Sequence, residues 1–353
     1  MSAPHDGAVF VLPTTTTGQL GPVAGWISTS GWAAAAEREL GHAWIVTRDG
    51  VRSVDEVRAG AARARPAAPT ATRLRARRAV PVVMKTLVKD LREARRAAKF
   101  TVPSTGPWHD LVGDLAFVWQ RHELFHQGGI HLAADLGVPS VLFVPALHVW
   151  QAERWSVGRP GWGRWLERTA EAPALRAATL VACGTDLVAE QAVRLGVPER
   201  RLIVTPTGVD LARFDRPVDR TATRQVLGLG DDFVVGWVGS FRAFHRVEQL
   251  IDAAALVGRV TLLLVGDGPE RARLEQRAAA AGVRAHFPGM VAHDELPSML
   301  AAMDVGVVLA APDVPFHYSP LKAAEYLAAG LPVVAPAVAQ LAERLDAGSN
   351  AEL

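Results

Sequence analysis

Residues 316–332 read FHYSPLKAAEYLAAGLP and carry the densest local signal in the chain. Ser319 is a residue type that caps helix N-termini, and Pro320 suits the first helical position. Gly330 is the residue type that ends helices, so the stretch predicts a helix over Leu321–Ala329. Both ends of this helix are therefore set by its own residues.

Lys322 is an unfavourably placed cation in this helix. It occupies the first turn, where a capping box would have Glu, and a cation there costs ~0.3–1 kcal/mol. A bound anion would offset that cost, because backbone N–H groups, the helix dipole and the ammonium group together form a phosphate site. Glu325 follows on the same face, where its carboxylate could accept hydrogen bonds from ribose hydroxyls. The alternative is an ordinary surface pair between Lys322 and Glu325.

Outward from this helix, short apolar runs alternate with amphipathic segments along the chain. This alternation is typical of βα units, and hence of α/β domains built on parallel sheets. Strands are predicted at Ala8–Leu12, Ala43–Thr47, Leu115–Trp119, Ser140–Val144, Thr179–Cys183, Leu202–Thr205, Phe233–Val238, Val260–Val265, Arg284–Phe287, Val305–Ala310 and Pro332–Ala335. The amphipathic segments between these runs are predicted to be helices.

The strands fall into two consecutive α/β sets. The seam lies near residues 206–217, where PTGVDLARFDRP breaks the periodicity. Nine of the ten tryptophans precede this seam and only Trp237 follows it, which indicates two domains of different character. We therefore predict an N-terminal domain over residues 1–208 and a C-terminal domain over residues 209–353.

The composition excludes several classes of protein. With 353 residues, 49% hydrophobic and 21% charged, the chain can bury a sizeable core and is not a disordered protein. No apolar run approaches the ~18 residues of a membrane span, and the first residues lack the features of a signal peptide. The single cysteine, Cys183, excludes an internal disulfide and a cysteine-rich zinc site. These observations predict a cytoplasmic enzyme.

Charge is unevenly distributed, although the net charge is only +2. Between Arg73 and Lys99, ten Lys and Arg side chains are opposed only by Asp90 and Glu93, whereas a nucleic-acid binder would spread its positive charge more widely. A helix predicted over Val82–Ala98 has an apolar stripe and a basic stripe. Residues 82–99 could therefore meet an anionic membrane, such as the inner membrane surface, or a polyanionic acceptor. The alternative is a solvated helix face.

The stretch SPLKAAEYLAAGLPVVAP, residues 319–336, resembles the donor-site segment of glycosyltransferase family 4. The resemblance implies the GT-B fold, in which two Rossmann-like domains face each other across a cleft and the C-terminal one holds the nucleotide-sugar. The family often has Glu-x7-Glu here, and this chain has His317-x7-Glu325. The resemblance therefore gives Glu325 the ribose and places His317 against the transferred sugar.

A second segment, VVGWVGSFRAFHRVEQLIDA, is similar to the family's strand, glycine turn and basic residues before a helix. Arg242 and His245 fall where the family has its diphosphate-binding Arg and Lys, and Arg246 replaces the usual glycine. Arg suits bidentate phosphate contacts; the alternative for each is a solvated loop charge. The predicted donor-binding residues are Gly239, Arg242, His245, Ser319, Leu321, Lys322 and Glu325.

Two departures from the family pattern matter. Pro145 stands where members often have a sugar-contacting His, and His148 follows three residues later as its candidate substitute. The alternative is a surface or core histidine. The resemblance also implies further helices after Leu353, so the C-terminal domain is expected to be incomplete. His148 and His317 are the predicted catalytic residues.

Residues 122–126, HELFH, fit the H-E-x-x-H pattern of zinc hydrolases, which places two His ligands on one face of a helix. Here the pattern directly follows the LAFVWQ strand, and Gly128-Gly129 come close behind it. Arg121, His122 and Glu123 could instead line a ligand site at the carboxyl end of that strand. Zinc hydrolysis is kept as a remote alternative.

The resemblance implies transfer of a sugar from a nucleoside-diphosphate donor to an acceptor hydroxyl, with retention of anomeric configuration. The acceptor is a glycan, a lipid-linked compound or a small molecule. No D-x-D occurs, so the usual carboxylate clamp for a metal–diphosphate is missing and no metal or other cofactor is expected. No pair of catalytic carboxylates stands out either, which disfavours a glycoside hydrolase. The alternative is a non-catalytic relative that binds nucleotide-sugar without turnover.

Overall fold

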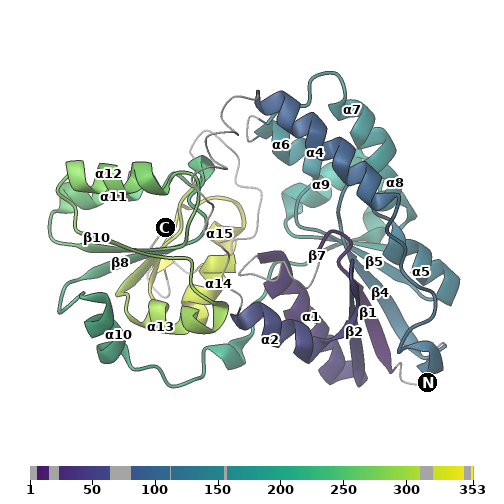
Figure 1. The fold of residues 1–353 in the computed structure, drawn as a ribbon, viewed down its shortest axis with the longest axis horizontal. Coiled ribbons are helices and arrows are strands. Elements are labelled where there is room, and N and C mark those ends of the chain that lie inside the picture. Colours follow the sequence, from purple (N-terminus) through teal and green to yellow (C-terminus); the bar gives the residue numbers. More distant parts are fainter. Residues whose placement is uncertain are drawn as a thin grey trace. The chain divides into compact units, whose positions relative to one another are not determined.

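The computed structural model describes residues 6–15, 24–63, 81–111, 113–154, 157–310, 321–345 and 351–352 (Figure 1). Contacts divide the chain into two compact units, with the division between Pro206 and Thr207. The N-terminal unit and the C-terminal unit each contain their own β-sheet with helices packed on it. The α/β class predicted from the alternating pattern is therefore confirmed.

The N-terminal unit has a seven-stranded sheet in the order β3-β2-β1-β4-β5-β6-β7. Its strands are β1 (Gly7–Val11), β2 (His42–Thr47), β3 (Gly50–Ser53), β4 (Leu115–Arg121), β5 (Ser140–Val144), β6 (Leu180–Cys183) and β7 (Leu202–Val204). All neighbours are parallel except β2 and β3. The strand order reverses at β1 and β4, so their carboxyl ends form a topological switch point.

The hairpin of β2 and β3 differs from the prediction, which placed no strand after Thr47. Gly50 has a φ of +131°, which its lack of a Cβ allows. The Thr47 hydroxyl contacts both Asp49 Oδ1 at 2.6 Å and the Gly50 carbonyl at 2.9 Å. Thr47 pairs with Gly50 in the ladder, so Arg48 and Asp49 form the turn that brings the chain back as an antiparallel edge strand.

Helices cover both faces of this sheet. They are α1 (Ala24–Leu40), α2 (Val54–Arg63), α4 (Val82–Ala97), α5 (Gly128–Leu136), α6 (His148–Arg154), α7 (Gly163–Leu166), α8 (Ala172–Ala177) and α9 (Asp186–Arg194). Consecutive strand residues such as Phe10 and Val11 belong to different apolar clusters, because successive side chains of a strand point to opposite faces of the sheet. Both faces of the sheet are therefore core.

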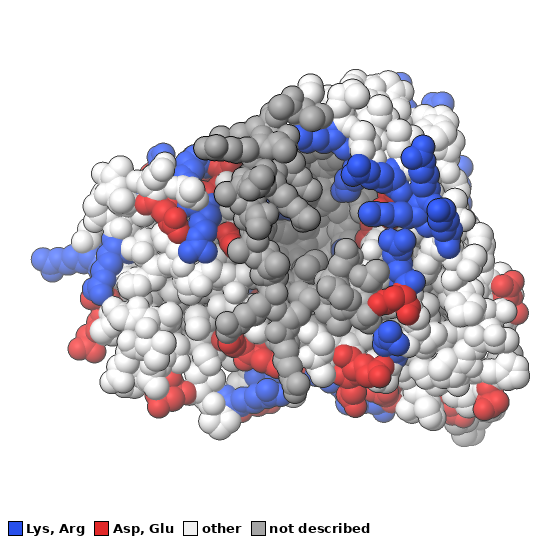
Figure 2. Space-filling model, viewed as in Figure 1, with Lys and Arg blue, Asp and Glu red and all other residues white. Residues whose placement is uncertain are grey.

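Helix α4 carries the concentrated positive charge. Lys and Arg side chains gather over this region of the molecule (Figure 2). Among the described residues, no helix is long and apolar enough to cross a membrane.

A π-helical turn over Glu167–Glu171 joins α7 to α8, with helical backbone at both junctions. Pro173 lies two residues beyond it. Proline lacks an N–H and its ring crowds the carbonyl four residues earlier, so a wider turn accommodates it. The turn also brings the Glu171 side chain into the interior, where it is fully buried.

The C-terminal unit has a six-stranded sheet in the order β10-β9-β8-β11-β12-β13, with all neighbours parallel. Its strands are β8 (Val234–Val238), β9 (Thr261–Val265), β10 (Ala285–Gly289), β11 (Val305–Val307), β12 (Val333–Val334) and β13 (Ala351–Glu352). Counted within the unit, this is the Rossmann order 3-2-1-4-5-6. The switch point lies at the carboxyl ends of β8 and β11.

The helices of this unit are α10 (Arg220–Leu227), α11 (Val247–Val257), α12 (Arg271–Ala280), α13 (Leu296–Ala301), α14 (Leu321–Ala328) and α15 (Ala339–Arg344). Helix α14 ends as predicted, because Gly330 has a φ of +68° and its N–H donates to the Leu327 carbonyl at 3.0 Å. Trp237, Ile251 and Leu264 belong to the apolar core between the sheet and α11.

Candidate functional site

The predicted donor residues of the C-terminal unit gather at its switch point. The loop after β8 contains Gly239, Arg242 and His245, and α14, which follows β11 along the chain, supplies Lys322 and Glu325. Ligands of open parallel sheets bind at the carboxyl ends of the strands where the order reverses. The topology therefore places these side chains where a ligand is expected.

Glycines let the loop after β8 approach its neighbour backbone to backbone. Gly239 has a φ of +154° and its N–H donates to the Val265 carbonyl at 2.9 Å. A Cβ on Gly266 would lie 1.8 Å from the Gly239 oxygen, a distance that real Cβ atoms do not reach. Glycine is therefore required at Gly266 for this loop to take its path.

Lys322 is the central cation of the site. Its Nζ lies 4.1 Å from the centroid of the Trp237 ring, and a Cβ on Gly239 would be 3.1 Å from that nitrogen. Burial lowers the pKa of the Lys322 ammonium to about 7, although the nearby Glu325 carboxylate acts to raise it. The ammonium is thus desolvated and close to half protonated at neutral pH, so a bound anion would stabilise it.

His245 contacts the same indole. Its ring meets that of Trp237 edge-on, with centroids 5.5 Å apart. Burial, and then the charges of Lys322 and Arg242, lower the pKa of His245 to about 3. His245 is therefore neutral at pH 7 and can offer a hydrogen bond to a diphosphate but no positive charge. The cations of the site are Lys322, which is largely buried, and Arg242, which is exposed.

Glu325 is held by a residue that sequence reasoning missed. Its Oε1 lies 3.1 Å from His293 Nε2, and both side chains are buried. Tyr326 fixes the same helix to the sheet, because its hydroxyl oxygen accepts the Val238 N–H at 3.0 Å. The contact with His293 fixes the orientation of the Glu325 carboxylate. His293, in the HDELP stretch after β10, gave no signal because its partner is 32 residues away.

Arg246 occupies the position where the resemblance implies glycine. Its φ of +54° and ψ of +34° lie in the left-handed region, which costs a residue with a Cβ roughly 1–2 kcal/mol. Such strain persists where the surrounding structure imposes it, often at binding sites. Here it sits at the start of α11, directly after His245.

Of the predicted donor residues, Gly239, His245 and Lys322 therefore cluster around Trp237, with Glu325 one helical turn from Lys322. Leu321 begins α14 and is half-buried. Ser319 and the predicted catalytic His317 lie outside the described residues.

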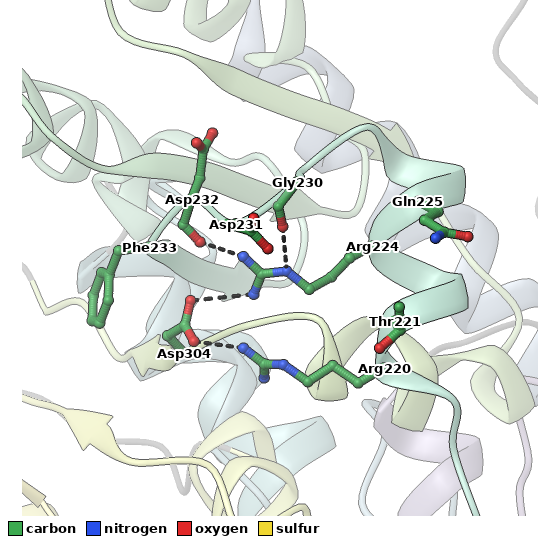
Figure 3. Close-up of a pocket in the computed structure, with 9 residues that line it drawn as sticks. All are labelled: Arg220, Thr221, Arg224, Gln225, Gly230, Asp231, Asp232, Phe233 and Asp304. Atoms are coloured by element: carbon green, nitrogen blue, oxygen red, sulfur yellow. Dashed lines mark hydrogen bonds and ion pairs between the residues drawn. The ribbon is translucent and has the colours of Figure 1, made fainter.

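A separate pocket of the C-terminal unit lies at the amino ends of β8 and β11, the opposite edge of the sheet (Figure 3). Arg220 Nη2 contacts Asp304 Oδ1 at 2.5 Å, and Arg224 Nη1 lies 3.3 Å from Asp304 Oδ2. Burial alone would raise the pKa of Asp304, but the Val234 N–H and the two arginines hold it below its usual range. Both arginines contact Asp304, and Arg224 also donates to the backbone carbonyls of Gly230 and Ala302, so these contacts anchor α10 to the sheet.

The switch point of the N-terminal unit has a different chemistry. Arg121 ends β4, and its guanidinium packs on Gly25 near the start of α1, where a Cβ would lie 3.3 Å from Arg121 Cζ. Arg121 Nε lies 3.6 Å from Glu123 Oε1, and Glu123 Oε2 lies 3.4 Å from His148 Nε2. A partly exposed row of base, acid and base therefore follows the carboxyl end of β4.

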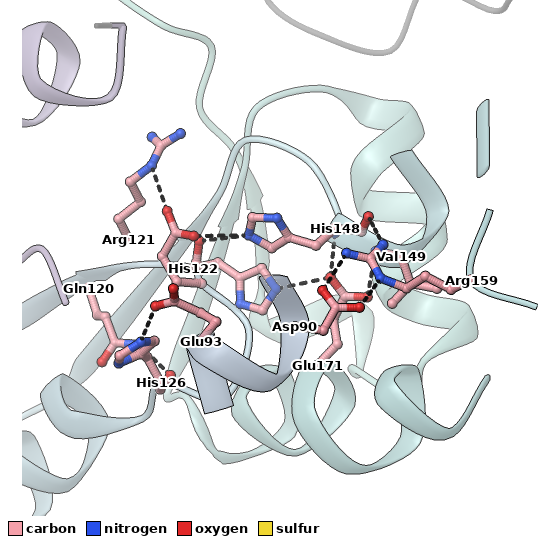
Figure 4. A network of polar contacts seen from close by, with 11 residues as sticks. Asp90, Glu93, Gln120, Arg121, His122, His126, His148, Val149, Arg159 and Glu171 are labelled. Carbon is pink, nitrogen blue, oxygen red and sulfur yellow. Dashed lines mark hydrogen bonds and ion pairs between the residues drawn. The ribbon is translucent and has the colours of Figure 1, made fainter. Parts of the chain in front are cut away.

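His148 is the first residue of α6, just beyond β5. Glu171 binds it there, with Oε1 accepting the His148 N–H at 2.5 Å and Oε2 accepting the Val149 N–H at 3.4 Å. His122 Nε2 lies 3.1 Å from the same Glu171 Oε1 (Figure 4). Burial alone would raise the pKa of Glu171, but these donors outweigh it and hold it below its usual range. Glu171 thus positions His148.

The zinc interpretation of residues 122–126 is wrong. The segment is a loop after β4 rather than a helix, and Phe125 within it has a φ of +71°. His122 Nε2 faces Glu171, whereas His126 Nε2 lies 3.1 Å from Glu93 Oε1 on α4. The described part of the chain contains no group of three His, Cys, Asp or Glu side chains that could hold a metal ion. His122 is also fully buried, so it does not line a site as expected.

Solved structures identify the fold class. Anabaena HepE, solved with UDP and glucose, matches with a TM-score of 0.58 and 17% identity, covering 98% of this chain and 85% of that one. Sucrose-phosphate synthase from Thermosynechococcus elongatus matches with a TM-score of 0.58 and 19% identity, covering 95% and 82%. The fold is that of the GT-B glycosyltransferases, as the resemblance implied.

Sequence comparison gives more specific relatives. Residues 232–353 match the family described as Glycosyl transferases group 1. A 2-deoxystreptamine N-acetyl-D-glucosaminyltransferase from Streptomyces fradiae is 33% identical over 188 residues, which cover 50% of this chain and 43% of that protein. A GDP-mannose-dependent alpha-mannosyltransferase from Mycobacterium tuberculosis is 32% identical over 225 residues, covering 60% and 53%. The chain spans about half the length of the curated relatives it matches.

Proposed function

We propose that the protein transfers a sugar from a nucleoside-diphosphate donor to an acceptor hydroxyl, with retained anomeric configuration and without a metal ion. The observation that carries this proposal is the desolvated Lys322 ammonium on Trp237, beside the Gly239 loop, at the switch point of a Rossmann-ordered sheet. The similarity of this unit to the Glycosyl transferases group 1 family supports it.

The chemistry follows from the charge that develops on the leaving group. As the bond between the anomeric carbon and the diphosphate breaks, negative charge grows on the diphosphate oxygens. Lys322 and Arg242 would meet this charge, and the N–H groups in the first turn of α14 would add to it. Neutral His245 would donate one hydrogen bond, and Glu325, oriented by His293, would accept from the ribose.

The acceptor is proposed to bind the polar row of Arg121, Glu123 and His148 in the N-terminal unit. This row offers the Arg121 cation, the Glu123 carboxylate as acceptor and the His148 imidazole, whose pKa burial lowers below its usual range, and such a mixture suits a polyhydroxylated compound. Relatives are named for action on 2-deoxystreptamine and on D-inositol 3-phosphate, which are candidate acceptor types to test. We also propose that His148 contacts the transferred sugar.

The test begins with nucleotide binding. UDP, GDP, ADP, TDP and CDP are screened for a rise in melting temperature, with and without EDTA. UDP is the first candidate, because the HepE structure holds UDP, and GDP is the second, because a relative is named for GDP-mannose. One nucleotide should stabilise the chain equally with EDTA present. Lys322→Ala should abolish the shift, whereas Arg259→Ala, an exposed cation before β9 at the opposite edge of the sheet, should not.

Turnover is then measured with the matching nucleotide-sugar and a panel of polyols. The product's anomeric configuration is read by NMR. Nucleotide binding with no transfer to any polyol and no donor hydrolysis would overturn the enzymatic proposal in favour of a binding protein. Loss of the thermal shift in EDTA, or inversion of the anomeric centre, would overturn those two details.

A further inference from the structure

Helix α4 docks on the N-terminal unit through its polar residues. Arg159 donates to Asp90 through Nε at 2.8 Å and Nη2 at 3.0 Å, and Trp162 Nε1 donates to Asp90 at 3.0 Å. Glu93, one turn further on, lies 3.1 Å from His126 Nε2. The inward face of the helix is thus acidic and hydrogen-bonded (Figure 4).

Most of the large apolar residues of α4 are exposed. Met84, Val88 and Leu91 are spaced to share one stripe, and their side chains are 48%, 39% and 52% exposed. A surface helix ordinarily turns such a stripe toward the core. Helix α4 is therefore inverted, with an apolar stripe held open to solvent by a polar anchor.

A stripe of basic residues lies beside the apolar one. The exposed basic residues of the segment are Lys85, Lys89, Arg92, Arg95, Arg96 and Lys99. The only acidic residues between positions 82 and 99 are Asp90, which is bound on the inward side, and Glu93, which lies between His126 and the exposed Arg96. The outward surface therefore has only positive charge, and this face of the molecule shows it as a concentration of Lys and Arg (Figure 2).

We propose that α4 is an interfacial helix that binds the surface of an anionic lipid bilayer. Apolar side chains between basic ones match a plane where acyl chains meet anionic headgroups. A soluble polyanion would use the basic stripe but would leave Met84, Val88 and Leu91 in water. The acids, which lipid phosphates would repel, are already bound within the protein. The helix would lie in the plane of the bilayer.

The test is flotation of the whole chain with vesicles of phosphatidylcholine alone or with 30% phosphatidylglycerol. The chain should float with the anionic vesicles and not with the neutral ones, and 0.5 M NaCl should weaken binding. This measurement needs neither donor nor acceptor, so its outcome is independent of the proposed transferase. Equal binding to neutral vesicles, or to neither, would overturn the proposal.

Two variants separate the two stripes. Lys85→Gln/Lys89→Gln/Arg92→Gln should lower the partition coefficient on the order of 100-fold, about fivefold for each charge. Met84→Ser/Val88→Ser/Leu91→Ser should lower it at least tenfold with the charge unchanged. Val226→Ser/Leu256→Ser is the matched control, because both side chains are exposed, 87% and 90%, on other helices. The melting temperature of each variant is measured alongside, and the glutamine variant should keep that of the parent, because Lys85, Lys89 and Arg92 are exposed.

Insertion of the apolar stripe into the bilayer is monitored with a dye at residue 91. Cys183 is buried, so a Leu91→Cys variant takes a polarity-sensitive dye at residue 91. The dye's emission should shift to the blue on anionic vesicles and stay unshifted with heparin. An unshifted dye on vesicles, or a serine triple variant that binds like the parent, would show a soluble polyanion site instead.

Discussion

Both units place charged side chains at the switch point of their sheet, but the surroundings of these charges differ between the two units. At the switch point of the N-terminal unit, Arg121 lies against Glu123, and Glu123 lies against His148. At the switch point of the C-terminal unit, Lys322 lies against an indole, and burial outweighs the influence of Glu325 on its pKa.

The comparison shows how to tell a scaffold from a ligand site. A fully buried charge that has its partner inside the protein needs no ligand, whereas a partly exposed pair such as Arg121 and Glu123 can still accept one. A desolvated cation whose pKa has fallen to about 7 costs stability, and a bound anion recovers that cost. By this criterion Glu171 is scaffold and Lys322 is the ligand-binding group.

Lys322→Met should give the largest effect and the clearest contrast. Removing one charge donor from a leaving-group site lowers transferase kcat/KM by on the order of 10²–10³-fold. The same change should raise the free energy of unfolding at pH 7, because it removes a desolvated ammonium. Transferase activity and urea unfolding, measured on one preparation, check the expected loss of kcat/KM and the expected gain in the free energy of unfolding. If Lys322→Met lowered stability instead, Lys322 would be a structural cation.

Glu171→Gln should show the reverse pattern. The substitution removes the buried Glu171 carboxylate, which pairs with the His122 imidazole, and should lower the free energy of unfolding by about 3 kcal/mol. Because the pKa of Glu171 is below its unfolded value, its contribution is present at neutral pH and lost as pH falls through the folded value. The variant should therefore lose part of the parent's acid sensitivity. Glu190→Gln, at an exposed site, should change stability by less than about 0.5 kcal/mol.

The pH dependence of nucleotide binding sharpens the same contrast. The pKa of Lys322 in the unliganded chain is about 7, so the ammonium form prevails below that pH and is lost above it. Apparent diphosphate affinity should fall by about tenfold between pH 6 and pH 8. His245, with a pKa of about 3, adds no change in this window. Calorimetry in two buffers should detect proton uptake on binding near pH 7.5, and its absence would contradict the assignment.

Arg246→Gly should give the smallest effect, in the stabilising direction. Glycine relieves the left-handed backbone and gains more than it loses in unfolded-state entropy, for a net of about 0.5–1 kcal/mol. Arg194→Gly in α9 is the control and should destabilise by a similar amount, because its backbone is helical. A destabilised Arg246→Gly would mean that the side chain contributes more than the strain costs.

Much of the fold is predictable because βα periodicity is local. The predicted strand Ser140–Val144 coincides with β5, and the helix predicted over Leu321–Ala329 ends one residue later than α14. Helix α10 was not predicted, although Asp219 caps its start and Gly228 ends it, because it is short and its Arg220 and Arg224 side chains contact residues 78–84 positions away.

The site was predictable only where one segment carries the signal. Lys322 and Glu325 stand in one helix, so their spacing could be read directly. His293 and Tyr326 join partners 32 and 88 residues away, and Glu171 meets His122 over 49 residues. Contacts over such separations leave no local period, so they become visible only when the sheet is assembled. The outward direction of the apolar stripe on α4 was hidden for the same reason.

The π-helical turn at Glu167–Glu171 has a consequence for insertions and deletions. A helix advances by about 100° per residue, so the extra residue of this turn sets the direction of everything after it. A one-residue deletion there would restore a regular helix and rotate Glu171 about a quarter turn away from His122 and His148. The number of residues before Glu171 is therefore constrained together with Glu171 itself, and lineages of this protein should conserve both the length of this turn and its last residue.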